Sequence, residues 1–351
     1  MASNPSAVLF KTDDLKVVDR PIPKPAPGQV QIAMHRVGIC GSDVHYWTHG
    51  AIGDFIVRAP MVMGHESAGI VNEVGEGVTT LKIGDRVAIE PGVPCRRCDY
   101  CKTGNYNLCP DMKFCATPPV DGSLARYYVH EADFCFKLPD HVTLEEGALL
   151  EPLSVGVHAC NRAGVRMGSK VLVCGAGPIG LVNLLTAKSY GASKVVITDL
   201  DSNRLQKAKE MGADCCIQVS RDMTAKDIAV KVKEYLGDLA TQTIECTGAE
   251  PSICAGIYST RSGGTLVLVG LGKPVVNIPI VDASVREVDI RGIFRYRNCY
   301  PTALEMVASG AVDVKPLVTH HYELEQTLDA FKTANNPTSG AIKVMIKCNV
   351  E

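Results

Sequence analysis

Four cysteines lie within fifteen residues of one another, at Cys95, Cys98, Cys101 and Cys109. Four thiolates from one loop can bind zinc tetrahedrally and leave no coordination position open, which is typical of a structural zinc site. Arginine and lysine residues in the same segment would offset the negative charge of zinc bound by four thiolates. The alternative is a set of free or redox-active thiols. The spacing therefore predicts a structural zinc loop.

A second group of possible zinc ligands lies outside that loop. Cys40 is in the segment GICGSDVH, and His65 and Glu66 are in GHESAGIV. Taken singly, each is more often a packed core residue, but together they match a catalytic zinc site with one open position. Such a zinc lowers the pKa of an alcohol hydroxyl by several units, so that the carbon can then release hydride.

A third motif favours a dinucleotide. Gly175, Gly177 and Gly180 form G-x-G-x-x-G between the strand-like KVLVC and a helical pattern, so a helix N-terminus would face the phosphates. Asp199 follows nineteen residues after Gly180, where a carboxylate accepts hydrogen bonds from ribose hydroxyls and disfavours a 2′-phosphate. Arg204 is the complication, because an arginine nearby can hold a 2′-phosphate. We predict NAD rather than NADP; a purely structural glycine turn is the alternative.

These motifs lie on two kinds of sequence pattern. Up to about residue 150, short β-rich runs such as 29–39 alternate with glycine and proline, which predicts a mostly β domain. From 170 onward strands and helices alternate, which predicts a parallel sheet with helices on both faces. After an amphipathic helix beginning near residue 300, the segment 341–347 predicts a strand that returns to the first domain.

Composition excludes several other classes of protein. The 351 residues carry a formal net charge of -2 and no basic run, so neither nucleic acid nor a membrane surface is an expected partner. The N-terminal segment lacks the pattern of a secretory signal, and the longest uncharged stretch, 171–187, is too short to span a membrane. Fifteen cysteines are an odd number and mostly scattered, which argues against a disulfide scaffold. A cytoplasmic enzyme is the expectation.

The order of these motifs carries a family resemblance. GHE-x2-G-x-V, the GDRV of residues 84–87, the four-cysteine loop and G-x-G-x-x-G resemble the zinc-containing medium-chain dehydrogenases. The longer stretches GICGSDVHYW, FCATPPVDG, EGALLEPLSVGVHA and GIFRYRN most closely resemble the sorbitol dehydrogenases, the polyol branch of that superfamily. The resemblance implies an α/β protein with a GroES-like catalytic domain, 1–153 and 295–351, around a Rossmann domain, 154–294.

The resemblance also implies roles for residues near the catalytic zinc. Cys40, His65 and Glu66 would bind it together with water, while Glu151 would contact that water and the substrate. Glu151 is also an alternative zinc ligand, or simply a carboxylate at a helix N-terminus. Ser42 and His45 would pass the substrate proton to solvent, a task that suits the near-neutral pKa of histidine.

Further residues are implied in substrate and cofactor binding, and for each of them a packing or surface role is the alternative. The expected substrate contacts are Tyr46, Phe114, Glu151, Arg295 and Tyr296. The expected NAD contacts are Gly175, Gly177, Ile179, Gly180, Asp199, Arg204, Val269, Gly270, Leu271, Ile293, Phe294 and Arg295. A polyol needs such polar groups along its length, whereas a simple alcohol needs only an apolar pocket.

The implied function is reversible hydride transfer from C2 of a sorbitol- or xylitol-like polyol to NAD, giving a 2-ketose such as fructose. Some family members lack part of the four-cysteine loop; this chain has all four cysteines, so two zinc ions per subunit are expected. The family suggests a homotetramer or homodimer. The alternatives are a related zinc dehydrogenase for another secondary alcohol such as threonine, and a non-catalytic NAD-binding protein.

Overall fold

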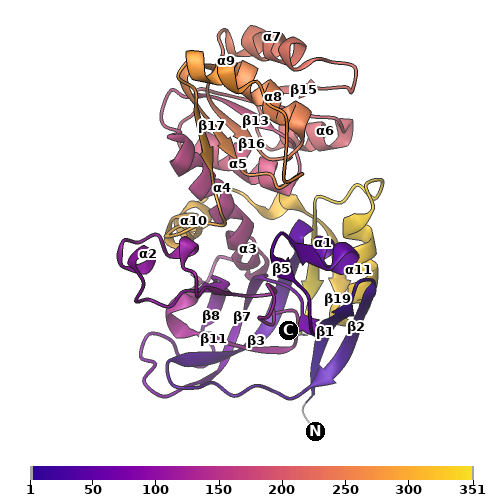
Figure 1. Ribbon diagram of the computed structural model, residues 1–351. Coiled ribbons are helices and arrows are strands. Elements are labelled where there is room, and N and C mark those ends of the chain that lie inside the picture. The colour runs from indigo at the N-terminus through magenta and orange to yellow at the C-terminus, as the bar shows by residue number, and fades with distance from the viewer. Residues whose placement is uncertain (1–2, 350–351) are drawn as a thin grey trace. The chain divides into compact units, whose positions relative to one another are not determined.

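The computed structural model describes residues 3–349, which form two compact units (Figure 1). The first contains the described residues up to Glu151, together with Ala303–Ala308 and those from Val314 onward. The second contains Pro152–Thr302 and Ser309–Asp313. The domain boundaries expected above at 153/154 and 294/295 stay a prediction, and the terminal residues 1–2 and 350–351 lie outside the described part.

A seven-stranded sheet forms the centre of the first unit. Its strand order is β12-β8-β7-β3-β20-β19, and β11 also pairs with β3. The strands are β3 (Gln29–Ile39), β7 (Glu66–Val74), β8 (Arg86–Ile89), β11 (Tyr127–Glu131), β12 (Cys135–Lys137), β19 (Val318–Glu323) and β20 (Lys343–Lys347). Most of β3 is buried, and it lies between β7 and β20 in the sheet.

The C-terminal strand β20 is antiparallel to β3, with Val344 opposite Ile39, which confirms that segment 341–347 returns to the first unit. A smaller sheet of order β2-β1-β6 lies in the same unit, with strands β1 (Asn4–Lys11), β2 (Asp14–Arg20) and β6 (Met61–Val62). The helices α1 (Gly41–His49) and α11 (Thr327–Asn335) pack through Trp47 and Phe331, whose rings meet edge to face at 5.9 Å. These contacts form one core that contains segments from both ends of the described chain.

Short elements complete the first unit. They are β4 (Ala51–Ile52), β5 (Phe55–Ile56), β9 (Gly92–Val93), α2 (Asp99–Lys102), η1 (Tyr106–Leu108), β10 (Lys113–Phe114), η2 (Ala132–Phe134), α3 (Leu144–Ala148), η3 (Lys315–Leu317) and η4 (Leu324–Gln326). The helices α4 (Leu150–Ala163) and α10 (Tyr300–Ala308) each begin in one unit and end in the other.

The second unit is built on a six-stranded, fully parallel sheet of order β15-β14-β13-β16-β17-β18. Its strands are β13 (Lys170–Cys174), β14 (Lys194–Asp199), β15 (Cys215–Gln218), β16 (Ala240–Glu245), β17 (Thr260–Leu268) and β18 (Asp289–Gly292). The order reverses between β13 and β16, which creates the crevice where parallel α/β sheets bind ligands. The alternation of strands and helices predicted from residue 170 is confirmed.

Five helices connect these strands: α5 (Pro178–Ser189), α6 (Ser202–Glu210), α7 (Ala225–Leu236), α8 (Glu250–Ser259) and α9 (Ile280–Val285). Helix α8 packs against α7 and α9, and the right-handed crossover rule places α5 and α6 on the opposite face of the sheet (Figure 1). Side-chain caps fix two of the starts, Asp201 at α6 and Thr224 at α7. Within residues 3–349, no helix has the length and apolar character that a membrane crossing requires.

The substitution Ile346→Ala tests how strongly β20 holds the C-terminal segment in the first unit. Ile346 is fully buried in the core, so its truncation should lower the free energy of unfolding by about 2–5 kcal/mol. Denaturant titration followed by circular dichroism measures the change. Lys347→Ala, at the neighbouring and more exposed position, is the matched control and should change stability by no more than about 0.5 kcal/mol. Equal effects of the two substitutions would contradict this role of β20.

Candidate metal centres and dinucleotide site

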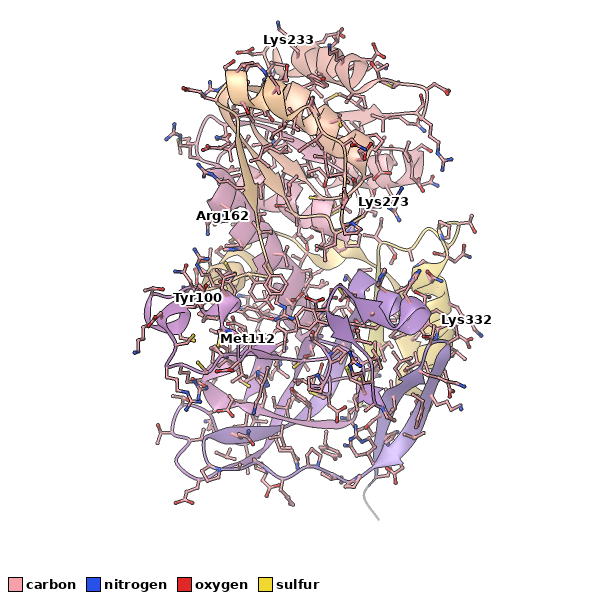
Figure 2. All side chains as sticks on the ribbon, in the orientation of Figure 1. Tyr100, Met112, Arg162, Lys233, Lys273 and Lys332 are labelled. Carbon is pink, nitrogen blue, oxygen red and sulfur yellow. The ribbon has the colours of Figure 1, made fainter. Side chains whose placement is uncertain are left out.

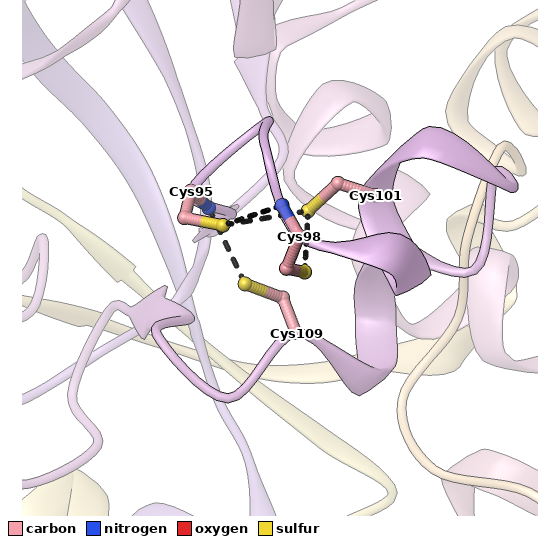
Figure 3. Close-up of side chains that lie close together, drawn as sticks. All are labelled: Cys95, Cys98, Cys101 and Cys109. Carbon is pink, nitrogen blue, oxygen red and sulfur yellow. Dashed lines mark hydrogen bonds between the residues drawn. The ribbon is translucent and has the colours of Figure 1, made fainter.

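The four cysteines of the predicted zinc loop lie together in the first unit (Figure 3). Their sulfur atoms are all within 4.8 Å of one another, and Cys98 Sγ lies 3.4 Å from Cys101 Sγ. That separation is far longer than a disulfide bond. Backbone N–H groups of Cys95 and Cys98 donate to Cys109 Sγ and Cys95 Sγ, each at 3.3 Å. Four converging sulfurs with supporting N–H donors match a tetrahedral zinc site.

The pKa values of these thiols show which of them the loop stabilises as thiolates. Hydrogen bonds from the backbone of Arg97 and Cys98 lower the pKa of Cys95 to about 6. Burial, and then the hydrogen-bonding interaction between Cys101 and Cys98, raise the pKa of Cys101 to about 12. Without a cation the cluster therefore cannot hold four thiolates at neutral pH, whereas a bound divalent metal deprotonates its thiol ligands. The donor set fits zinc.

The loop is attached to the body of the first unit by polar side chains. Arg96 has a positive φ of 64° and pairs with the exposed Asp133 at 2.7 Å. Tyr106 donates a hydrogen bond of 2.6 Å to Glu90 Oε1. Burial raises the pKa of Glu90 to about 7, although this hydrogen bond opposes the rise. These contacts attach the loop to the first unit at two points between its first and last cysteines.

The second predicted ligand group also comes together. The ligand atoms of Cys40, His65 and Glu66 lie within 4.8 Å of one another. Cys40 follows the end of β3 and is the N-cap of α1, while Glu66 begins β7. Gly38 on β3 faces Glu66 in the antiparallel register, and a Cβ on Gly38 would lie 2.3 Å from Glu66 Oε2. The strand pairing therefore brings the three residues together and requires a glycine beside them.

Asp43 connects the two segments that carry these ligands. Its carboxylate accepts hydrogen bonds from the backbone N–H of Cys40 at 3.0 Å and of Gly64 at 3.2 Å. Its Oδ1 also lies 3.4 Å from His65 Nδ1. Burial opposes protonation of His65, but the charges of Asp43 and Cys40 outweigh it and raise the pKa of His65 well above its usual value. The site therefore attracts positive charge.

Lys343 reaches the same site from β20. Its Nζ donates to Glu66 Oε1 at 2.6 Å and to the carbonyl of Ile39 at 3.2 Å, and both charged side chains are almost completely buried. Since β3 lies between β7 and β20, the absence of a side chain at Gly38 lets Glu66 and Lys343 meet across it. Burial alone would lower the pKa of Lys343, but the Glu66 carboxylate outweighs it and raises that pKa. Lys343 is therefore a cation at neutral pH.

The other oxygen of Glu66 supports the presence of a metal ion. Glu66 Oε2 is buried and has no hydrogen-bond partner among the described residues. Leaving a buried carboxylate oxygen unpaired is costly. A cation held by this oxygen, the Cys40 thiolate and the His65 imidazole would remove that cost. Sulfur, nitrogen and oxygen donors with a further open position match catalytic zinc.

Glu151 occupies a different place from the three grouped ligands. It is 5% exposed in the first turn of α4. Among residues 3–349, the ligand group within 4.8 Å contains Glu66 and not Glu151. Burial raises the pKa of Glu90 to about 7 and that of Cys115 to about 11, and the charge of Glu151 contributes to both shifts. The charge of Glu151 also contributes to the raised pKa of Lys343, so Glu151 is close enough to influence the site electrostatically.

The residues expected on the proton path lie on α1. Ser42 and His45 follow Cys40 by two and five positions, and His45 is exposed. The His45 ring stacks on that of His49, with centroids 4.4 Å apart. Partial burial, and then the charge of His49, lower the pKa of His45. Its imidazole is consequently neutral and able to accept a proton at pH 7.

Besides Glu151, two of the expected substrate contacts, Phe114 and Tyr46, lie in the first unit. Phe114, on β10, is 7% exposed, and its ring centroid is 5.8 Å from that of His65. Tyr46, on α1, is 3% exposed and belongs to the buried core cluster. The structure thus brings Phe114 beside the ligand group, whereas for Tyr46 it records packing in the core.

The dinucleotide motif forms a tight turn between β13 and α5. Gly175 has φ of 96°, Gly177 is the N-cap of α5, and a Cβ on Gly180 would lie only 1.8 Å from the carbonyl oxygen of Gly175. Asp199 ends β14, and its Oδ2 accepts a hydrogen bond of 2.6 Å from the N–H of Ala176 in the turn. The helix N-terminus and the acidic residue therefore lie together, as a dinucleotide site requires.

The other expected NAD contacts belong to the same unit. Arg204, on α6, has its Nη1 3.7 Å from the place a Cβ on Gly177 would take, so its guanidinium borders the turn. The segments 269–271 and 293–295 follow the ends of the neighbouring strands β17 and β18, at the carboxyl edge of the sheet. A Cβ on Gly270 would lie 2.1 Å from the N–H nitrogen of Gly248, so backbone alone fits there.

Arg295 and Tyr296 follow β18 in the second unit. Arg295 has a positive φ of 53°, and its guanidinium lies 4.7 Å from the centroid of the Phe294 ring. Tyr296 is 3% exposed, with its ring 5.8 Å from that of Tyr300. The structure places both in an unusual turn after β18, and their contact with substrate stays a prediction.

Sequence reasoning missed three residues that shape these sites. Asp43 carries a weak signal, because an acidic residue three positions after Cys40 can form a capping box. Lys343 carries another, because it is a lysine in an otherwise apolar strand. Glu245 is fully buried at the end of β16 and accepts hydrogen bonds from the N–H groups of Thr247 and Gly248. Nothing in the local pattern distinguishes it.

Comparison with known proteins gives the family context. The alcohol dehydrogenase GroES-like domain family matches residues 26–140, and the zinc-binding dehydrogenase family matches residues 178–309. Sorbitol dehydrogenase of Gallus gallus is 58% identical over 346 residues, covering 99% of this chain and 97% of that protein. Sorbitol dehydrogenase of Homo sapiens is also 58% identical, over 347 residues, covering 99% of this chain and 96% of that protein.

Solved structures show the same architecture. L-idonate 5-dehydrogenase from Escherichia coli has a TM-score of 0.91 at 31% identity, covering 99% of this chain and 98% of that one. 2R,3R-butanediol dehydrogenase from Bacillus subtilis has a TM-score of 0.90 at 31% identity, covering 99% of this chain and 100% of that one. The predicted combination of a GroES-like domain with a Rossmann sheet is confirmed. The chain belongs to the sorbitol dehydrogenase family of zinc-binding dehydrogenases.

Proposed function

We propose that the protein is a zinc-dependent polyol dehydrogenase that oxidises the C2 hydroxyl of a sorbitol-like polyol to a 2-ketose and reduces NAD. One observation carries the proposal: Cys40, His65 and Glu66 converge with a buried Glu66 oxygen that no described residue satisfies. A protein that only bound NAD would gain nothing from this arrangement. The sorbitol dehydrogenases to which this chain is similar over nearly its whole length support a polyol as the substrate class.

Cys40, His65 and Glu66 would hold the catalytic zinc, and the four cysteines of the loop a structural one. When bound, catalytic zinc lowers the pKa of the substrate hydroxyl and polarises the ketone in the reverse direction. Asp43 orients the ligands, since it holds the backbone of Cys40 and lies beside His65. Lys343 offsets the negative charge of Glu66.

The protein's own groups would move the proton and position the reactants. Ser42 and His45 would relay the proton of the hydroxyl to solvent, and the lowered pKa of His45 keeps its ring ready to accept it. Phe114 beside His65 would exclude water from the reacting carbon. Glu151 would contact a substrate hydroxyl.

NAD would bind to the second unit and accept the hydride. The N–H groups at the start of α5 would bind its pyrophosphate, and Asp199 its adenosine ribose. Segments 269–271 and 293–295, with Ile179, would complete the contacts. Arg295 and Tyr296 would donate hydrogen bonds to polyol hydroxyls, a role for which the family resemblance is the support.

We also propose an assembly and a cellular location for the protein. The terminal strand β18 of the parallel sheet and the exposed apolar side chains Val281 and Val285 on α9 support pairing of two subunits at this edge. We expect a homodimer or homotetramer in the cytoplasm. The expected domains are 1–153 with 295–351, and 154–294.

A substrate panel tests the proposed function. With the zinc-loaded enzyme, sorbitol and xylitol should reduce NAD with a kcat/KM at least about tenfold above that of threonine, because the expected polar contacts pair with successive hydroxyl groups. NAD should be preferred over NADP by a similar factor, because Asp199 repels a 2′-phosphate. NADH absorbance measures both ratios.

Cys40→Ala provides the control for that panel. It should lose about a thousandfold or more in turnover, because removing a ligand removes several kcal/mol of transition-state stabilisation, and yet bind NAD normally. Cys254→Ala, a partly exposed cysteine in the second unit, should retain activity. Threonine as the preferred substrate, or an active Cys40→Ala variant, would overturn the proposal.

Metal analysis tests the loop of four cysteines. The purified protein should contain two zinc ions per chain, and Cys98→Ser should contain one. Because loss of a structural metal removes folding free energy, this variant should also melt about 5–10 °C lower. Cys215→Ser, at a cysteine outside both ligand groups, should retain both metals and melt with the wild type. One zinc in the wild-type chain would refute the structural site.

The pH dependence of kcat/KM tests His45. Because the pKa of His45 is lowered, it accepts a proton above that pKa, and activity should fall only as the pH drops below the ordinary histidine value of about 6.5. His45→Gln should remove this acidic limb and slow turnover by about ten- to a hundredfold. His49→Gln should shift the limb to higher pH, because the positive charge of His49 lowers the pKa of His45. An unchanged profile in both variants would exclude His45 from the proton path.

A further inference from the structure

A cavity of about 370 Å³ in the second unit is lined by cationic and amide side chains. None of its lining residues belongs to the predicted zinc, substrate or NAD contacts. Three come from α4, one from β18 and two from the turn that follows β18. They are His158, Asn161, Arg162, Arg291, Arg297 and Asn298. This set, which we call the arginine pocket, contains three guanidinium groups and, among the described residues, no lining carboxylate.

Two of the arginines are held in place by reciprocal contacts between α4 and β18. Arg162, labelled in Figure 2, donates from Nη2 to the carbonyl of Gly292 at 3.2 Å. Arg291 donates from Nη1 to the carbonyl of Arg162 at 2.8 Å. Arg291 also pairs with Asp289 at 2.6 Å, but Asp289 is 60% exposed and outside the lining. Since a guanidinium has five N–H donors, these contacts orient the groups without using all of their donors.

The lowered pKa of His158 reflects the positive charges that line the pocket. Only 4% of the residue is exposed, and it lines the cavity. Burial, and then the charges of Arg297 and Arg162, lower its pKa to about 4. The imidazole is therefore neutral at physiological pH and can donate one N–H. An anion bound in the pocket would lie among these positive charges and would be attracted by them.

We propose that the arginine pocket binds a phosphate group, either as the free anion or as part of a small organic molecule. Planar guanidinium groups pair with phosphate oxygens through two parallel N–H···O bonds, and such charge-assisted bonds are stronger than neutral ones. The Asn161 amide and the His158 ring supply further donors. The volume lies within the range typical of small-molecule sites.

The location of the pocket gives the bound anion a structural consequence. Arg291 and Arg297 flank segment 293–296 in the sequence, and Asn298 has a positive φ of 53°. An anion shared by Arg162 on α4 and Arg297 would restrain the turn that also carries Arg295. This binding activity goes beyond the proposed polyol oxidation and does not depend on it.

Calorimetric titration of the zinc-loaded enzyme with inorganic phosphate tests the proposal. Saturating NAD fills the phosphate-binding turn at Gly175–Gly180, and sodium chloride keeps the ionic strength constant. We expect saturable binding of one phosphate per chain. Arg162→Gln and Arg297→Gln should each weaken it about tenfold, because each removes charge-assisted hydrogen bonds. Arg261→Gln removes the same charge from an exposed position on β17 of the same unit and should leave the affinity unchanged.

A parallel titration with glucose 6-phosphate distinguishes the two sources of the phosphate group. Tighter binding than that of inorganic phosphate assigns the pocket to an organic phosphate, and equal binding assigns it to the free anion. An NMR titration of His158 gives an independent readout, since a bound anion stabilises the imidazolium and should raise its pKa from about 4.

Three outcomes would overturn the proposal. They are the absence of saturable phosphate binding in the NAD-saturated enzyme, equal phosphate affinity in all three arginine variants and the wild type, and an unchanged His158 pKa at saturating phosphate. Each is a binding or titration measurement, so it is distinguishable from failure of the proposed polyol oxidation.

Discussion

The first unit buries the Glu66 carboxylate completely, and much of the surrounding structure compensates for that charge. An ionised carboxylate away from water is tolerated only when cations or hydrogen bonds replace its hydration. Lys343 satisfies one oxygen from β20, the second oxygen has no hydrogen-bond partner among the described residues, and the carboxylate is grouped with the ligand atoms of Cys40 and His65. Gly38 makes both contacts geometrically possible. The order of the strands, the absence of a side chain at Gly38 and the chemistry of the ligands thus all serve to stabilise the buried Glu66 carboxylate.

The two candidate zinc sites meet the cost of ligand charge in different ways. The loop of four cysteines is local in sequence and keeps its sulfurs only partly buried, with backbone N–H groups supporting thiolate character. The Cys40, His65 and Glu66 group combines three donor types from two separate segments of the chain and relies on a buried lysine for charge balance. The first arrangement leaves no position open, as a structural site requires; the second has only three protein donors, as catalysis requires.

The sequence could predict those features whose interacting residues lie close together along the chain. The strands at 29–39 and 170–174, the glycine turn and the cysteine loop each carry their signal within a short segment, and the structure forms all four. Lys343 lies 277 positions from Glu66, so no local pattern could reveal their pairing. The arginine pocket likewise joins α4 to β18, about 130 positions later. Roles for Arg295 and Tyr296 came only from family resemblance, because a turn with positive φ has no distinctive spacing.

The distance along the chain between Glu66 and Lys343 also bears on the order of synthesis. During translation Cys40, His65 and Glu66 emerge early, while the lysine that balances Glu66 emerges only after the whole second unit has been made. Until β20 inserts beside β3, the ligand group lacks both a cation and the strand that encloses it. The nascent first unit therefore lacks the residue that offsets the negative charge of Glu66. Completion of this sheet therefore waits for residues 343–347, whereas all four cysteines of the loop are present once residue 109 has emerged.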